Sequence, residues 1–454
     1  MNIKHFYDEA LAQGSFAIES EGKVALVDPY RDIEPFVKFS EEHNAKIVAV
    51  FETHPHADFI SSHLEIQKRF GATIYVNEKV GVSYDYTHMG HGDEVKIGQV
   101  TFKALFTPGH SPDHNSYLLL DENREQKAVF TGDSLFVGDV GRPDLREGAG
   151  NIQVSRKELA GMMYDTVNDV FADLSDDTIV YPAHGAGSLC GKNMSSDLSS
   201  TIANEKANNW AFQIKDKGKF VDAFLEGQSF IPKYFPNSVE VNRKGAKALD
   251  EAVKNAEKKD GLEIPKGSII IDTRAKEDFK KGHLKGAINI QNKEDDKFET
   301  WLGSIVAPDE KYYLIADNDE ALNFAIYRAA KIGYENNLVA AVTNPKGETV
   351  TDPQVNLDDF KNNPDAYTII DIRNQSEVAD GKFFDSAKNI PLPELRERAS
   401  EINTQKPVVV HCAGGYRSAA GFSIVKSLLP NAKVYDLSDA VKEFKQLTTT
   451  SSNS

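Results

Sequence analysis

The chain has 454 residues, of which 40% are hydrophobic and 27% are charged, and its net charge at pH 7 is -17. This length predicts about three domains, and the composition is that of a soluble protein with buried cores. The negative charge argues against nucleic acid and anionic membranes as main partners. No apolar run approaches spanning length and the N-terminal residues lack a signal-peptide core, so we expect a cytoplasmic protein.

Cysteine usage agrees with that compartment. Cys190 and Cys412 are the only two cysteines, and they lie far apart in the chain. A disulfide framework is therefore excluded, and a reducing compartment with reactive thiols is favoured.

The first half of the chain is predicted to alternate strands with helices. Apolar residues recur at helical spacing in some segments, and β-branched runs mark the others. The expected elements are a hairpin over 15–28, helices over 33–43 and 61–70, and strands over 46–51, 73–76 and 100–106.

Several predicted strands run directly into loops that carry metal-ligand residue types. The loops hold His54, His56 and Asp58 after one strand, then His110, Asp133 and His184 after three others. Histidine nitrogens and carboxylate oxygens bind transition metals when they converge at one point. The pattern predicts a metal site at the strand ends.

The order of these motifs, HxHxD, TPGH, TGD and PAHG, resembles the metallo-β-lactamase superfamily. The resemblance implies an α/β fold, a four-layer αβ/βα sandwich with the metal at one edge of its two sheets. Most members have a histidine where this chain has Phe59, which cannot bind metal. We therefore expect one metal ion instead of two.

Within that superfamily, the segments 130–135 and 141–144 are most similar to persulfide dioxygenases. This resemblance implies one Fe(II) per chain, bound by His54, His110 and Asp133. Two histidines and one carboxylate leave positions open for O2 and substrate. The remaining motif residues, which are His56, Asp58 and His184, would then orient the ligands through hydrogen bonds.

Two residues near the predicted site have two interpretations each. Arg142 is either part of a surface salt bridge or a clamp for a carboxylate or phosphate of the substrate, and we favour the clamp. Cys190 is either a small buried hydrophobe or a catalytic thiol whose pKa the neighbouring Lys192 would lower. Both interpretations of Cys190 stay open.

The second half of the chain repeats itself after about a hundred residues, which is the size of a small domain. Residues 268–274 match 367–373, and 286–290 match 386–390. Each copy alternates short strands with helices, so each is expected to be an α/β unit with a mostly parallel sheet. The expected domains are 1–243, 244–345 and 346–454.

The second copy contains a cysteine loop between a predicted strand and a helix. Cys412 begins the loop, where backbone N–H groups and a helix N-terminus would stabilise a thiolate, and Arg417 adds a positive charge. The loop resembles that of active rhodaneses, in which the cysteine carries sulfur as a persulfide. The resemblance implies catalytic roles for Cys412 and Arg417, and substrate binding by Ala413, Gly414, Gly415, Tyr416 and Ser418.

The first copy lacks this chemistry. Where the loop should be, it has Asp317, Asp319 and Glu320 and no cysteine. Three carboxylates would repel an anionic sulfur. The copy therefore resembles an inactive rhodanese, and we expect it to serve assembly.

Taken together, the chain is similar to the persulfide dioxygenase–rhodanese fusions of bacterial sulfide oxidation. That resemblance implies O2-dependent oxidation of a low-molecular-weight thiol persulfide to sulfite, and sulfur exchange at Cys412 among persulfide, sulfite and thiosulfate. The alternative is a zinc thioester hydrolase of the glyoxalase II kind with an accessory sulfurtransferase domain. We expect a homo-oligomer without nucleic acid or membrane partners.

Overall fold

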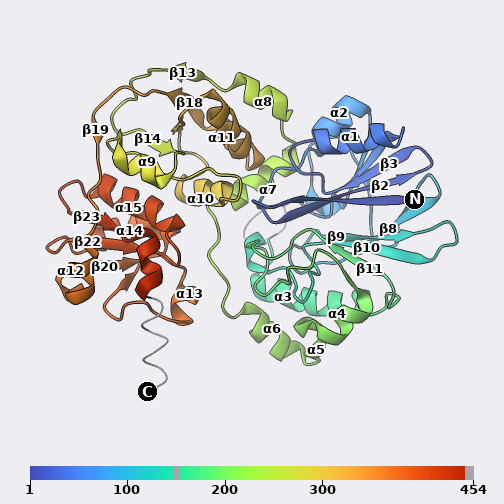
Figure 1. The fold of residues 1–454 in the computed structure, drawn as a ribbon. Helices are drawn as coiled ribbons and strands as arrows, with labels where there is room; N and C mark the ends of the chain where they lie inside the picture. Colours follow the sequence, from blue (N-terminus) through green and yellow to red (C-terminus); the bar gives the residue numbers. More distant parts are fainter. Residues whose placement is uncertain (148–152, 445–454) are drawn as a thin grey trace. The chain divides into compact units, whose positions relative to one another are not determined.

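The computed structural model describes residues 1–147 and 153–444. The chain divides into two compact units, Met1–Ala252 with Ala330–Gly333, and Val253–Ala329 with Tyr334–Ser454 (Figure 1). Residues 148–152 of the predicted first domain and 445–454 of the predicted third lie outside the described residues. The boundaries expected near residues 243 and 345 remain predictions.

Among the described residues, the first unit forms two six-stranded sheets. The first sheet has the order β1-β2-β3-β4-β5-β6, with strands β1 Asn2–Asp8, β2 Gln13–Ser20, β3 Lys23–Val27, β4 Lys46–Phe51, β5 Thr73–Val76 and β6 Thr87–His88. The second has the order β12-β11-β10-β9-β8-β7, with strands β7 Glu94–Ile97, β8 Val100–Phe106, β9 Asn115–Leu120, β10 Gln126–Gly132, β11 Ile179–Pro182 and β12 Ser200–Thr201.

Both faces of each sheet are apolar, which explains the layered architecture. In β3, Ala25 and Val27 face the core between the sheets, while Val24 and Leu26 face the core under helices α1 (Glu34–Glu42) and α2 (His63–Phe70). Successive side chains of a strand point to opposite faces, so a strand that is apolar throughout must be covered on both sides. The predicted four-layer sandwich follows from this pattern.

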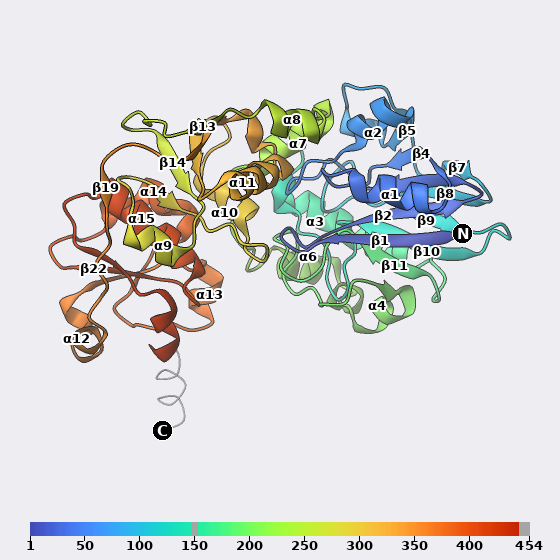
Figure 2. The ribbon, with the colours of Figure 1, turned by 45° about the horizontal axis from the view of Figure 1, so that its top comes forward.

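Helices cover the outer faces of the two sheets (Figures 1 and 2). Those on the first sheet are α1 Glu34–Glu42 and α2 His63–Phe70, and those that pack on the second are α3 Arg156–Asp165, α4 Ile202–Asn208, α5 Trp210–Gln213 and α6 Lys217–Leu225. Two further helices follow, α7 Phe235–Lys244 and α8 Leu249–Asn255.

The bounds of the predicted elements agree with the structure except at some helix ends and in the hairpin, whose strand β2 begins at Gln13 instead of residue 15. Strands β4, β5 and β8 match the predicted ranges, whereas the helix expected from residue 61 begins at His63. The reason is that Ser61 belongs to the preceding loop. Its N–H donates to the Asn242 side chain and its hydroxyl donates to Glu52.

The second unit contains two parallel sheets within its described residues. One has the order β13-β18-β17-β14-β16, with β13 Lys258–Asp260, β14 Ile269–Asp272, β16 Ile288–Asn289, β17 Tyr312–Ile315 and β18 Leu338–Thr343. The other has the order β21-β20-β22-β23, with β20 Thr368–Asp371, β21 Lys388–Asn389, β22 Val408–His411 and β23 Val434–Asp436. The short strands β15 His283–Leu284 and β19 Thr349–Val350 pair antiparallel. The helices are α9 Lys276–Lys281, α10 Phe298–Ile305, α11 Asp319–Lys331, α12 Leu357–Asn362, α13 Gln375–Ala379, α14 Leu395–Arg398 and α15 Tyr416–Leu428.

The two halves of this unit repeat the same hydrogen bonds, as the sequence repeat predicts. In the first half, Arg274 pairs with Asp272, and Asn289 donates to the carbonyls of both residues. In the second half, the arginine two residues beyond the strand aspartate forms the same pair, and Asn389 donates to the equivalent carbonyls. Because these buried bonds join a strand end to the loop beside it, they fix the same turn in both copies.

No helix among the described residues combines the length and the apolar character needed to cross a membrane.

We expect Glu299→Ala to lower the free energy of unfolding of the second unit by about 3–5 kcal/mol, because it removes the carboxylate partner of a buried guanidinium. The Arg328 Nε–H donates to Glu299 over 2.8 Å, and both side chains are inaccessible to solvent. Denaturant unfolding followed by circular dichroism measures the change. Glu443→Ala is the control, since it breaks only the exposed pair with Lys361 and should leave the midpoint unchanged. Equal midpoints for the two variants would contradict the expectation.

Candidate metal centre and cysteine loop

Three side chains converge at one edge of the two sheets of the first unit. The Nε2 atoms of His54 and His110 lie 3.9 Å and 3.6 Å from Oδ2 of Asp133. The three ligand atoms lie within 4.8 Å of one another, and all three residues are buried. These are the residues that the sequence predicts as metal ligands.

The strands bring these residues together from three places in the sequence. His54 follows β4 in the first sheet, while His110 follows β8 and Asp133 follows β10 in the second. Loops at the ends of packed strands lie at a common edge, where a rigid scaffold places their side chains.

The hydrogen bonds of the two histidines leave their Nε2 atoms available for a metal. His54 Nδ1 lies 3.0 Å from Oγ1 of Thr53, and His110 Nδ1 lies 2.9 Å from the carbonyl oxygen of Arg142. Both carboxylate oxygens of Asp133 are buried without a hydrogen-bond partner. A buried carboxylate without donors is costly unless a cation is bound, so the three residues fit a metal ion.

Burial sets the protonation of this cluster. It lowers the pKa of His54 well below its ordinary value and that of His110 to about 4, so both rings are neutral at pH 7. Burial alone would raise the pKa of Asp133, but the neighbouring His184 and His110 outweigh it and lower that pKa. Neutral imidazoles and an ionised carboxylate are the forms that bind metal.

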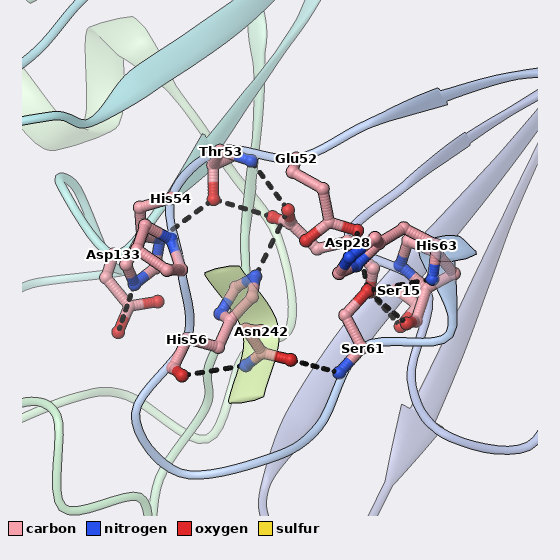
Figure 3. Close-up of polar contacts among 12 residues, drawn as sticks. Ser15, Asp28, Glu52, Thr53, His54, His56, Ser61, His63, Asp133 and Asn242 are labelled. Carbon is pink, nitrogen blue, oxygen red and sulfur yellow. Dashed lines mark hydrogen bonds and ion pairs between the residues drawn. The ribbon is translucent and has the colours of Figure 1, made fainter. Parts of the chain in front are cut away.

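Asp28 holds the histidine loop in place (Figure 3). Its carboxylate accepts the N–H and the hydroxyl of Thr53, over 2.7 and 2.8 Å, and lies 3.1 Å from Nε2 of His56. Burial lowers the pKa of His56, but the ion pair with Asp28 is stronger and raises it to about 9. His56 thus pairs with Asp28, a residue that was not among the predicted site residues. The signal that could have identified Asp28 is its position directly after the apolar strand β3.

A second group of possible ligands adjoins the first. His184 Nε2 lies 3.4 Å from Asp58 and 3.5 Å from Oδ1 of Asp133, while its Nδ1 lies 3.0 Å from the carbonyl of Ala12. Among residues 1–147 and 153–444, Asp58, His184 and Cys190 form one of three groups that could hold a metal. The third group is Asp28, Glu52 and His56.

Phe59 and Cys190 both lie beside these possible ligands. Phe59 is buried, and its ring packs against that of His56 with centroids 4.2 Å apart. Burial, together with the negative charges of Asp133 and Asp58, raises the pKa of Cys190 well above its ordinary value. The expectation that Lys192 lowers this pKa is therefore wrong, because burial and the two carboxylates all act in the opposite direction.

The guanidinium of Arg142 is paired within the chain, which favours the salt-bridge interpretation over the clamp. Its side chain is buried, and Nε and Nη2 donate to the two oxygens of Asp144 over 2.7 and 2.6 Å. The remaining donors bond the Ser229 hydroxyl and the carbonyl oxygens of Leu189, Ser229 and Phe230. The guanidinium of Arg142 is thus fully engaged, and the contact of this residue with the metal centre is its carbonyl oxygen, which orients the ring of His110.

In the second unit, Cys412 lies between β22 and α15, as the sequence predicts. It is buried, and the N–H of Gly415 donates to its sulfur over 3.1 Å. Gly415 has φ +97, and a Cβ there would lie 2.8 Å from backbone atoms of 438 and 439. The loop therefore needs glycine at this position to curl around the sulfur.

The side chains of the loop are held by neighbours. Arg417 forms a bidentate pair with Glu377 over 2.7 and 2.6 Å, so its charge is balanced by a carboxylate. The Ser418 hydroxyl donates to the carbonyl of Gly415, and the Tyr416 hydroxyl donates to the carbonyl of Gln291. The structure therefore disfavours substrate binding by the side chain of Ser418, because its hydroxyl is already bonded within the first turn of α15. Ala413 and Gly414 are partly exposed at the mouth of the loop.

Residues 10–184 match the family described as the metallo-beta-lactamase superfamily, and residues 246–342 and 356–447 match the rhodanese-like domain. A hydroxyacylglutathione hydrolase from Dictyostelium discoideum is 31% identical over 220 residues, which are 47% of this chain and 75% of that protein.

Two crystal structures are also similar. A metallo-beta-lactamase from Staphylococcus aureus subsp. aureus COL has 29% identity and a TM-score of 0.65, covering 76% of this chain and 99% of its own. ETHE1 from Myxococcus xanthus has 29% identity and a TM-score of 0.46, covering 54% and 98%.

The fold, the site and these matches define a metal-binding α/β protein with two rhodanese-like domains. The chain belongs to the metallo-beta-lactamase superfamily, and the predicted fold class is confirmed.

We expect Gly141→Ala to weaken metal binding at least about 10-fold, the scale of losing a partner that orients a ligand. A Cβ at this position would lie 1.9 Å from the carbonyl oxygen of Asp133 and 3.2 Å from Nδ1 of His110, so the substitution crowds the backbone of one ligand and the ring of another. Titration of metal-free protein with Co(II) measures the affinity. Gly138→Ala is the control, because a Cβ there meets no atom within 4 Å, although its φ of +80 adds local strain. Unchanged affinity in Gly141→Ala would contradict this account.

Proposed function

We propose that the chain is a persulfide dioxygenase joined to an active sulfurtransferase domain. The observation that carries the proposal is the set of two histidines and one carboxylate, the arrangement that suits non-haem Fe(II) oxygen chemistry. A rhodanese-like cysteine loop in the same chain supports the choice of a persulfide as substrate.

In this proposal His54, His110 and Asp133 hold one ferrous ion, which supplies the redox chemistry that lets O2 oxidise the terminal sulfur to sulfite. The protein keeps the ligands in their binding forms. Thr53 and the Arg142 carbonyl direct the Nε2 atoms of the histidines towards Asp133. Burial of the cluster excludes bulk water and so favours neutral imidazoles.

Cys412 is proposed to exchange sulfane sulfur among persulfide, sulfite and thiosulfate. The Gly415 N–H at the sulfur stabilises negative charge there, which is the form needed for attack. The proposed partners are a low-molecular-weight thiol persulfide, O2, sulfite and thiosulfate. A homo-oligomeric assembly and a cytoplasmic location belong to the same proposal.

A second candidate is thioester hydrolysis with zinc, because the Dictyostelium relative bears the name hydroxyacylglutathione hydrolase. Zinc would act there by activating water. Phe59, which offers no ligand at the second metal position, weighs against a dinuclear hydrolase.

We expect the wild-type protein to contain iron and to consume O2 when given glutathione persulfide, and Asp133→Ala to lose both properties. The variant removes the only carboxylate of the proposed centre, and its thiosulfate-to-cyanide sulfur transfer should stay intact. Metal analysis and an oxygen electrode provide the measurements. Zinc content with hydrolysis of a glutathione thioester would support the second candidate and refute the dioxygenase.

Cys412→Ser should show the opposite behaviour. A hydroxyl is not ionised near pH 7 and cannot carry a sulfane sulfur, so sulfur transfer is lost while persulfide-dependent O2 uptake remains. Cys190→Ser is the matched control and should keep sulfur transfer. Transfer that persists in Cys412→Ser and disappears in Cys190→Ser would assign the carrier role to the other thiol.

A further inference from the structure

The loop that carries His54, His56 and Asp58 is buried along most of its length, although it forms no helix or strand. Residues 54 and 56–61 are each at most 5% exposed. A buried loop must find partners for its N–H and C=O groups, because each unsatisfied group costs free energy. The partners that this loop uses show what holds its conformation.

Asn242 of helix α7 supplies three of them, and Figure 3 shows its bonds to His56 and Ser61. Its Nδ2 donates to the carbonyl oxygens of His56 and Phe59, both over 2.8 Å. Its Oδ1 accepts the N–H of Ser61, also over 2.8 Å. One buried amide thus bonds both ends of the turn that contains Phe59, and more than 180 positions separate it from each partner.

Tyr234, the residue before α7, supplies a fourth. Its hydroxyl donates to the carbonyl oxygen of Asp58 over 3.0 Å. The start and the last turn of α7 therefore contact successive backbone groups of the same loop. Both side chains are buried, so water does not compete for these bonds.

We propose that Asn242 and Tyr234 are positioning residues of the metal centre. By holding the carbonyls of His56 and Asp58, they set where the two side chains lie. The ring of His56 packs against that of His54, with centroids 4.3 Å apart, and Asp58 pairs with His184. A shift of the turn therefore moves the surroundings of His54 and of Asp133.

Helix α7 lies outside residues 10–184, the part that matches the superfamily. The contacts that Asn242 and Tyr234 make with the loop thus come from the polypeptide that follows the matched region. The inference rests on metal binding by His54, His110 and Asp133, which is part of the proposed function, and not on the reaction that the metal supports.

Co(II) titration of the full-length, metal-free protein tests the proposal. The variants are Asn242→Ala, which removes three hydrogen bonds, and Tyr234→Phe, which removes one oxygen atom. Asn289→Ala is the matched control, because that buried amide also donates to two backbone carbonyls but lies in the second unit. Absorption spectra of the bound Co(II) report the ligand geometry, and thermal unfolding of the metal-free protein reports stability.

We expect Asn242→Ala to weaken Co(II) binding by about 10- to 100-fold, the range found for partners that orient ligands, and to change the spectrum. Tyr234→Phe should act in the same direction with a smaller effect. Asn289→Ala should lower the unfolding temperature without changing affinity or spectrum. The double variant should lose less affinity than the two single losses combined, because both residues act on one loop.

Wild-type affinity and spectrum in Tyr234→Phe and Asn242→Ala would overturn the proposal. If Asn242→Ala does not fold, Tyr234→Phe decides, since losing one hydroxyl leaves the packing intact. Asp133→Ala tests the metal centre separately from the positioning role of Asn242 and Tyr234. If Asp133→Ala binds Co(II) as tightly as the wild type, the assignment of the metal centre is wrong. If Asp133→Ala loses Co(II) binding while Asn242→Ala and Tyr234→Phe bind normally, only the positioning role is wrong.

Discussion

The carboxylate of Asp28 is the contact on which the metal centre depends most. It bonds the backbone and the hydroxyl of Thr53 and pairs with His56, and Thr53 in turn orients His54. Asp28 itself has φ +47, a left-handed conformation that costs energy in residues other than glycine. The surrounding sheets stabilise this strained residue, so the position of His54 follows from the packing of the whole first unit.

The same packing explains why so many charged groups are tolerated in one place. Neutral histidines, paired carboxylates and a few buried arginines share a region from which water is excluded. Arg146, for example, is fully buried and pairs with Asp113. Its positive charge helps to lower the pKa of His54 and of His110. Each charge there is costly alone and acceptable when paired, and within the described part of the chain both oxygens of Asp133 lack a hydrogen-bond partner.

The two thiols of the chain meet opposite surroundings. Cys190 lies against the carboxylates of Asp133 and Asp58, which oppose a negative charge on sulfur. Cys412 begins a loop whose backbone turns an N–H towards the sulfur. The second arrangement suits a nucleophile, and the first suits a neutral thiol. The proposed division of labour between the units rests on this difference.

Local sequence was enough to predict several of the strands, the repeat in the second half and the loops that carry His54, His110, Asp133 and Cys412, but it did not predict strands β1, β7 and β9. Those features depend on short-range periodicity and on residues next to strand ends, which a linear pattern records. Only the tertiary structure decided what each side chain bonds. Arg142 pairs with Asp144, Arg417 pairs with Glu377, and the amide of Asn242 bonds a loop far from it in sequence. These partners depend on which donors and acceptors become buried together when the chain folds, because buried polar groups must be paired. The linear sequence does not show which groups these are.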